Sequence, residues 1–196
     1  MRGYVADMSQ LLPASVILRD VSMRDGLQDE MPVPTETKLA LFEALVSSGV
    51  RALELTSFVR PDRVPAMADA DELCAATTGA DVVRWGLVLH RRGAERALAA
   101  GLTHLQYVVS VSNTHSQHNA GASTDDAIAA FEAIAGPMID QGAVMEMTLS
   151  TAFGCPYEQR IDPERVVEVA RRVVDAGASS IGLADTIGVA IPSEVA

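Results

Sequence analysis

Four segments of the chain repeat one pattern of polar and apolar positions. Each is a stretch with helical periodicity that ends at a glycine and is followed by a short apolar run; the glycines are Gly49, Gly101, Gly142 and Gly177. Glycine adopts the left-handed conformation that closes a helix at little cost. A short run rich in Val, Leu and Ile is typical of a strand buried on both faces, as in a parallel sheet. The repeat therefore predicts helix–strand units along the chain.

The apolar runs and the helix-like stretches alternate throughout. Thr35 and Ser123 are candidate N-caps, and Pro163 suits the first turn of the fifth predicted helix. Alternation at this spacing predicts βα units and a parallel sheet. We expect strands near 16–21, 51–56, 82–89, 104–110, 144–150 and 179–184, and helices near 36–48, 67–77, 91–100, 124–140 and 163–176.

Two α/β architectures fit this alternation, an open doubly wound sheet and a TIM (β/α)8 barrel. No GxGxxG or GxxxxGK follows a predicted strand, which removes the commonest signs of a nucleotide-binding open sheet. Polar residues cluster at the carboxyl ends of the strands, where barrels assemble their active sites. Only six strands are predicted, and the sequence stops where a sixth helix should start. We expect residues 1–196 to form a single partial TIM-barrel catalytic domain, truncated after about six βα units.

Composition narrows the class of protein. Of the 196 residues, 48% are hydrophobic and 4% aromatic, and the net charge is −11, which argues against nucleic-acid binding. No apolar run approaches the roughly 20 residues of a membrane span. The first residues, MRGYVADMSQLLP, lack the apolar core of a secretory signal, and two cysteines make no disulfide framework. We therefore expect a cytoplasmic, reduced protein.

Candidate chemistry begins at the end of the first predicted strand. Asp25 offers the carboxylate oxygen that a hard divalent cation prefers, and Arg24 has the planar guanidinium that can hold an oxyanion. Glu54 lies inside an apolar strand, where a carboxylate is costly unless it pairs or ligates, so it could pair with Arg24 or orient a metal ligand. For residues 24–30 the alternative is a solvated charged loop, and for Glu54 the alternative is an ordinary Glu–Arg bridge.

Asp185 follows the sixth predicted strand. It is a candidate for a base, for a carboxylate that contacts the ligands of a metal, or for a helix cap. His115 and His118 have a spacing that would suit metal binding only in a helix, but Gly121 and the polar run predict a loop. His90 follows the third strand, where a simple hydrogen-bonding role is expected. For the two thiols, we expect Cys155 to be structural and Cys74 to be packed in a helix.

The chain resembles 3-hydroxy-3-methylglutaryl-CoA lyase, a member of a superfamily of metal-dependent lyases and Claisen synthases on TIM barrels. Five motifs in the same order carry the resemblance, and together they point to the lyase branch. They are Arg24-Asp25-Gly26-Leu27-Gln28, Glu54-Leu55-Thr56-Ser57-Phe58-Val59, Val64-Pro65-Ala66-Met67, Gly154-Cys155-Pro156-Tyr157-Glu158 and Asp185-Thr186-Ile187-Gly188-Val189.

The resemblance implies a retro-Claisen cleavage of a 3-hydroxyacyl-CoA to acetyl-CoA and a keto acid such as acetoacetate. It implies a divalent metal, Mg²⁺ or Mn²⁺, with Asp25 as a ligand that also assists deprotonation of the substrate hydroxyl. Arg24 would stabilise the enolate oxygen, and Glu54 and Asp185 would be active-site carboxylates. The residues expected to contact the acyl-CoA substrate are Gln28, Ser57, Asn119 and Thr148.

Several positions depart from the family pattern. Met23 replaces a proline, Asn113 replaces a glutamate after Ser112, His90-Arg91 replaces Pro-Asn, and Thr148 replaces a tyrosine, whereas Asn119 is kept. Because these changes surround the pocket, the accepted acyl group could differ. The His-x-His metal pair, a further Asn ligand and a mobile catalytic Cys of the family have no counterpart in this sequence. We therefore expect this chain alone to be inactive.

Two alternatives remain at this stage. Ser112-x-x-His115 is similar to a feature of the condensing synthases, which join acetyl-CoA to a keto acid. A non-catalytic shortened barrel is the other alternative, because six strands leave two edges that could pair with a further chain. We expect a homodimer or a higher oligomer.

Overall fold

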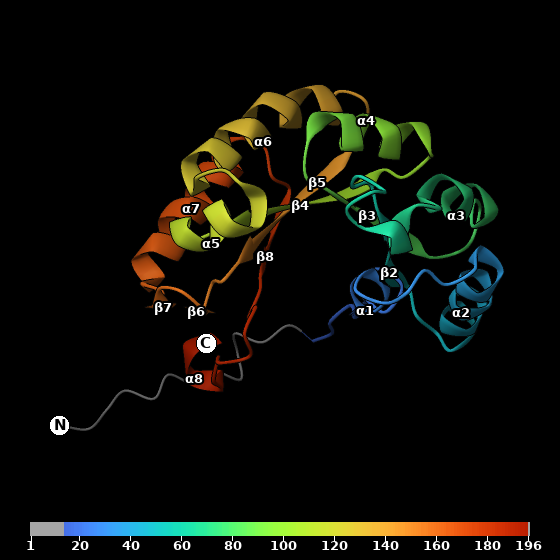
Figure 1. Cartoon of the computed structure of the whole chain (residues 1–196), viewed down its shortest axis with the longest axis horizontal. Helices are drawn as coiled ribbons and strands as arrows, with labels where there is room; N and C mark the ends of the chain where they lie inside the picture. The colour runs from blue at the N-terminus through green and yellow to red at the C-terminus, as the bar shows by residue number, and fades with distance from the viewer. Residues whose placement is uncertain (1–13, 196) are drawn as a thin grey trace.

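The protein is described by a computed structural model that covers residues 14–195. A six-stranded, all-parallel sheet forms its centre, with the strands in chain order (Figure 1). A doubly wound sheet would reverse its strand order at a switch point. The sequential order is that of a barrel with six of its eight strands, which confirms the predicted fold class. The strands are β1 (Arg19–Asp20), β2 (Ala52–Ser57), β3 (Val83–Val88), β4 (His104–Ser110), β5 (Val144–Ser150) and β8 (Ser180–Leu183).

The longer helices follow one another along an arc outside the strands (Figure 1). These helices are α2 (Thr35–Ser47), α3 (Ala70–Ala76), α4 (Arg91–Ala99), α6 (Thr124–Ile139) and α7 (Pro163–Asp175). Shorter elements occupy the connections, and several of them lie at the carboxyl ends of the strands. They are α1 (Asp25–Gln28), the 3-10 helix η2 (Pro65–Met67), α5 (Asn113–Ala120), the hairpin β6 (Gly154–Cys155) with β7 (Gln159–Arg160), and α8 (Pro192–Val195).

The glycine repeat has the predicted backbone conformation. Gly49, Gly101, Gly142 and Gly177 have φ values of 101°, 83°, 89° and 106°. At these angles a side chain would strain the backbone, so glycine ends α2, α4, α6 and α7 and turns the chain into the next strand.

The two faces of the sheet differ in chemistry. Leu105 and Met145 belong to the hydrophobic core and are fully buried. Because side chains alternate along a strand, Gln106, Glu146 and Thr148 face the opposite side, which is the interior of the partial barrel. The helices therefore cover an apolar layer, and the inner face is free to carry polar groups.

Three local predictions need correction. Only Arg19–Asp20 pairs as β1, and the preceding Val16–Leu18 stretch is exposed instead of lying in a strand. The stretch after β4 is the helix α5, not a loop, because Ser112 caps its start and Gly121 ends it in the left-handed conformation. Thr35 does not cap α2; it is the first helical residue and its hydroxyl donates to Asp69.

Other terminal signals agree with the structure. The Ser123 hydroxyl accepts a hydrogen bond from the Asp126 amide at the start of α6, and Pro163 occupies the first turn of α7. The predicted lack of a secretory signal falls on residues 1–13, outside the described residues. Among residues 14–195, no helix combines the length and the apolar character needed to cross a bilayer.

Candidate active site

The predicted pair of Arg24 and Glu54 forms at the carboxyl end of β1. The Nε of Arg24 donates to Oε2 of Glu54 at 2.6 Å, and a second guanidinium nitrogen lies 2.5 Å from the same oxygen. The Glu54 side chain is only 4% exposed and that of Arg24 13%. A buried carboxylate thus fixes the position of the arginine, and such a pairing offsets the cost of burying either charge.

Asp25 and Gln28 complete this cluster from the single turn of α1. Arg24 donates to the Asp25 carboxylate at 2.8 Å and to the Gln28 side-chain oxygen at 3.3 Å. The Gln28 amide in turn donates to Asp25 at 3.2 Å. Because Asp25 is 54% exposed, it is the carboxylate of the cluster that remains open to an incoming molecule. Four predicted site residues therefore lie together.

A second buried ion pair was not predicted from the sequence. Arg19 donates two hydrogen bonds of 2.6 Å to the Glu146 carboxylate on β5. The same guanidinium lies 3.8 Å from Glu54 and 3.8 Å from the centre of the Trp85 ring. Charges of alternating sign therefore run from Asp25 through Arg24, Glu54 and Arg19 to Glu146.

Thr148, a predicted substrate contact, lies inside the barrel beside this network. Its hydroxyl accepts a hydrogen bond of 2.9 Å from the Gln106 amide. The other end of Gln106, its Oε1, is buried and has no hydrogen-bond partner among the described residues. Gln106 pairs with Glu146 across the β4–β5 ladder. An unsatisfied acceptor of this kind is available to a donor on a ligand or a water.

The ends of β4 and β5 carry a chain of hydroxyl groups that ends at a histidine. The hydroxyls of Ser110 and Ser150 lie 2.9 Å apart, and Ser110 lies 2.6 Å from Nδ1 of His115. Burial, with the charge of His118 nearby, lowers the pKa of His115. The neutral imidazole is thereby favoured at pH 7. His118 stacks on Tyr157, with the ring centres 4.5 Å apart.

The other predicted polar residues have more ordinary surroundings. The Asp185 carboxylate accepts hydrogen bonds from the amides of Val189 at 3.0 Å and Ala190 at 2.8 Å, so it caps the turn that follows β8. Asn119 is exposed in the last turn of α5, and Ser57 is buried at the end of β2. No described contact joins these three residues to Arg24.

The cysteines and His90 agree with their predicted structural roles. Cys155 is buried and its thiol donates to the Ser112 hydroxyl at 3.0 Å. Cys74 is fully buried in α3, and this burial raises the pKa of its thiol to about 12. His90 caps α4 by accepting a hydrogen bond from the Gly93 amide at 3.0 Å.

The described residues do not build a complete metal site. Within residues 14–195, no group of three or more His, Cys, Asp or Glu side chains is placed to hold one ion. Glu54 is already bound by Arg24, and His115 is bonded to Ser110. Asp25 is the one predicted ligand with an exposed carboxylate, so this part of the chain supplies a single oxygen donor.

Comparison with known proteins gives a consistent result. A family model described as HMGL-like matches residues 15–196. An (R)-citramalyl-CoA lyase of Chloroflexus aurantiacus is 38% identical over 194 residues, which cover 93% of this chain and 61% of that protein. A hydroxymethylglutaryl-CoA lyase of Bacillus subtilis is 33% identical over 185 residues, with 93% and 62% of the two proteins covered.

Solved structures give the same relationship. The HMG-CoA lyase of Bacillus subtilis superposes with a TM-score of 0.89 at 32% identity, over 93% of this chain and 62% of that one. An HMG-CoA lyase of Acinetobacter baumannii, solved with coenzyme A and 3-methylmalate, gives a TM-score of 0.86 at 33% identity, over 91% and 59%. The chain thus spans about three fifths of the length of these relatives. By its sequence motifs, its strand order and these matches, the chain belongs to the HMGL-like family.

Proposed function

We propose that this chain forms part of the active site of a lyase that cleaves a 3-hydroxyacyl-CoA by a retro-Claisen reaction. The family match and two relatives that are named as citramalyl-CoA and hydroxymethylglutaryl-CoA lyases support this reaction class. Each substrate in those names is a thioester with a hydroxyl on its third carbon. Cleavage between the second and third carbons gives acetyl-CoA and a keto acid.

The fixed guanidinium of Arg24 is the observation that carries the proposal. In the reaction, the hydroxyl loses its proton and its oxygen becomes a carbonyl as the carbon–carbon bond breaks. The electron pair of that bond moves into the thioester, which becomes an enolate, and a proton that balances the one lost by the hydroxyl then adds at carbon to give acetyl-CoA. The developing negative charge needs a donor that is already in place. Arg24 is such a donor, because its Nε is held 2.6 Å from the Glu54 carboxylate.

Glu54 acts in this scheme as a positioning residue. Its carboxylate is used by Arg24 and lies near Arg19, so it has no exposed oxygen to offer the substrate. Asp25, by contrast, is exposed and lies 2.8 Å from Arg24. In the proposed reaction the Asp25 carboxylate receives the hydroxyl proton beside the donor that stabilises the enolate.

Members of this family generally depend on a divalent metal. The described residues fit such an ion only in part, since Asp25 is their single exposed donor at this cluster. The remaining ligands would have to come from outside the described residues. Asp25 as an Mg²⁺ or Mn²⁺ ligand thus stays a prediction, as do the substrate roles of Gln28, Ser57, Asn119 and Thr148 and the active-site role of Asp185.

The test is an assay of acetyl-CoA release from both hydroxymethylglutaryl-CoA and citramalyl-CoA, with Mg²⁺ or Mn²⁺ present. It is run on this chain and on the whole product of the reading frame that encodes it. Where cleavage occurs, we expect Arg24→Gln to lower kcat about 10²–10³-fold, as loss of an oxyanion donor does. Arg51→Gln, the same change at the opposite end of β2, should leave it unchanged.

Two results would contradict the proposal. An Arg24→Gln protein with wild-type kcat would remove the enolate role of Arg24. Free CoA formed from acetyl-CoA and a keto acid, with no cleavage of either hydroxyacyl thioester, would assign the chain to the condensing branch instead.

A further inference from the structure

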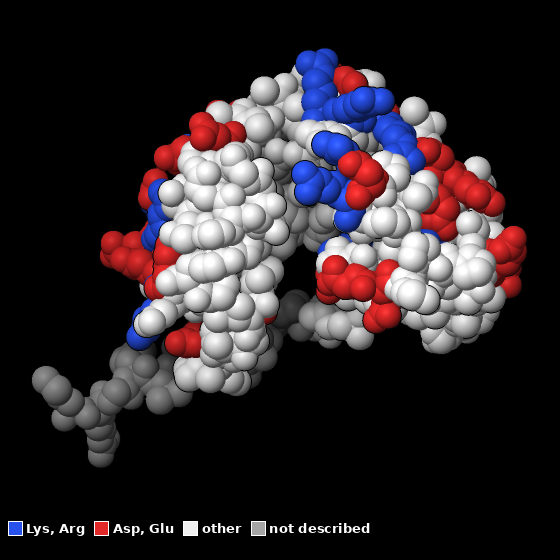
Figure 2. All heavy atoms as spheres, in the orientation of Figure 1, with Lys and Arg blue, Asp and Glu red and all other residues white. Residues whose placement is uncertain are grey.

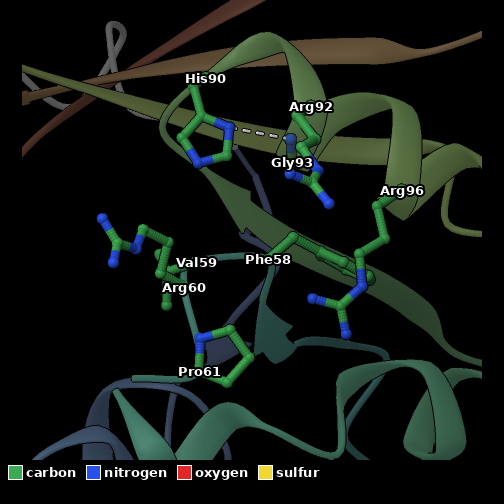
Figure 3. Close-up of a pocket in the computed structure, with 8 residues that line it drawn as sticks. All are labelled: Phe58, Val59, Arg60, Pro61, His90, Arg92, Gly93 and Arg96. Carbon is green, nitrogen blue, oxygen red and sulfur yellow. Dashed lines mark hydrogen bonds between the residues drawn. The ribbon is translucent and has the colours of Figure 1, made fainter. Parts of the chain in front are cut away.

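A pocket rich in arginine lies at the carboxyl ends of β2 and β3, the same end of the sheet as the cluster described above. It has a volume of about 610 Å³ and lies between the loop after β2 and the first turns of α4 (Figure 3). This volume is within the range of small-molecule sites, about 300–1,000 Å³. Its lining residues are Phe58, Val59, Arg60, Pro61, His90, Arg92, Gly93 and Arg96.

The charge of this pocket is opposite to that of the whole chain. The sequence carries a net charge of −11, yet the pocket is lined by three arginines and no carboxylate. Figure 2 shows basic side chains gathered on the part of the surface that lies over α4. A local concentration of one sign attracts ligands of the other sign, even on a protein of the same overall charge as the ligand.

The three guanidinium groups keep free donors. Arg92 makes no hydrogen bond or ion pair with the described residues, and its side chain lines the pocket from α4 (Figure 3). Arg60 uses Nε and one terminal nitrogen for Asp62, and Arg96 does the same for Asp71. Each of these two arginines therefore has a second terminal nitrogen left for a ligand, since a guanidinium has five N–H groups.

His90 adds a ring nitrogen to the pocket. Its Nδ1 accepts a hydrogen bond from the Gly93 amide, so in the neutral ring the proton is on Nε2. In Figure 3 this second nitrogen lies on the side of the ring away from Gly93. The pocket thus presents N–H donors from a loop and a helix, and the two carboxylates that pair with its arginines, Asp62 and Asp71, are not among its lining residues.

Glycine at position 93 brings the two walls together. A Cβ added at Gly93 would lie 2.7 Å from the backbone oxygen of Phe58 and 3.3 Å from the His90 ring. Any larger residue would push the start of α4 away from the loop after β2. The close approach places Arg92 and Arg96 on the same side of the fold as Arg60.

We propose that Arg60, Arg92 and Arg96 bind the phosphate ester or pyrophosphate group of a phosphorylated ligand. Guanidinium groups match the geometry of phosphate oxygens through paired N–H donors. Resting on the proposed function, the natural source of these groups is the phosphorylated end of the acyl-CoA. The acyl end would lie at Arg24, which follows the neighbouring strand β1 at the same end of the sheet.

Binding is measured by isothermal titration calorimetry with three probes, CoA, pantetheine and inorganic pyrophosphate. CoA and pyrophosphate should bind and pantetheine, which has no phosphate, should bind at least about tenfold more weakly. We expect Arg92→Gln and Arg96→Gln each to weaken CoA about tenfold, the loss of one charge-assisted hydrogen bond. Arg92→Lys, which keeps the charge and loses the planar fork, should fall between wild type and Arg92→Gln.

Arg51→Gln is the matched control, because it removes the same charge at the other end of β2 and should leave CoA affinity unchanged. CoA binding that is equal in wild type, Arg92→Gln and Arg96→Gln would overturn the pocket assignment and leave the proposed lyase function standing. Pyrophosphate binding without CoA binding would support the phosphate pocket and contradict the acyl-CoA substrate. Binding of neither probe would overturn the pocket itself.

Discussion

Replacing Glu54 by glutamine should destabilise the fold far more than the loss of a surface charge. The carboxylate neutralises Arg24 at 2.5 Å and lies 3.8 Å from Arg19, and both arginines are largely buried. The amide keeps the shape and one acceptor but removes the negative charge. Asp25 is then the only carboxylate that still pairs with Arg24, and because it is 54% exposed it compensates weakly.

The expected magnitude follows from these contacts. Removing one partner of a buried ion pair costs about 3–5 kcal/mol. Arg19 keeps its two hydrogen bonds to Glu146, so only one of the two arginines loses its principal partner. We therefore expect a loss of about 3 kcal/mol in the free energy of unfolding, which corresponds to a fall of about 6–12 °C in Tm for a chain of this size.

Urea unfolding at pH 7 measures the change, and the chain has a convenient probe. Trp85 is the single tryptophan, and it is 8% exposed with the Arg19 guanidinium 3.8 Å above its ring. Unfolding moves this indole into water and changes its fluorescence. The midpoint of that change and its slope give the free energy of unfolding.

Asp125→Asn is the control, because Asp125 is 68% exposed and pairs with Arg172 at the surface. Exposed ion pairs contribute about 0–1 kcal/mol, so this variant should stay within that range. If Glu54→Gln unfolds within about 1 kcal/mol of wild type, the buried pair is not the stabilising contact described above.

Three further predictions test other parts of the structure. Gly93→Ala should lower the free energy of unfolding by about 1–3 kcal/mol because its Cβ meets the Phe58 oxygen, whereas Gly136→Ala, with open space in α6, should raise thermal stability slightly; equal Tm values would contradict this. Cys74, whose pKa is raised to about 12, should resist iodoacetamide at pH 8 until the chain unfolds, as read by mass spectrometry of its peptide. Because the pKa of His115 is lowered in the folded state, the unfolded state binds more protons as the pH falls below about 6.5. The free energy of unfolding should therefore decrease as the pH falls from 7 to 5. His115→Gln should show a shallower decrease over this range in urea titrations.

The sheet could be predicted because its signals are local. Four of the six strands, β2, β4, β5 and β8, follow a glycine that ends a helix, and these four glycines have the positive φ that the pattern implied. The pairing of Arg24 with Glu54 could also be predicted from the sequence, since a carboxylate inside an apolar strand needs a partner. The sequence suggested Arg24 as that partner, and the structure confirms it.

Other features depend on contacts that the sequence does not reveal. Arg19 and Glu146 are 127 residues apart and meet only because β1 and β5 face the same interior. Helix α5 lacks an apolar stripe, so its polar composition suggested a loop. Its signals were the terminal residues, Ser112 as a cap and Gly121 in the left-handed conformation. The arginine pocket likewise joins a loop and a helix that only the folded chain brings together.

The sequential order of the sheet has a consequence for how the chain is made. Each strand pairs with the strand of the βα unit before it, so no strand must wait for a partner that is synthesised much later. The ladder between β4 and β5 uses all seven residues of each strand, whereas β1 pairs through two residues. The βα units can therefore join the sheet one after another during synthesis, and the longest strand pairing, between β4 and β5, lies in the middle of the chain. A unit that misfolds would leave the strand of the next unit without its pairing partner.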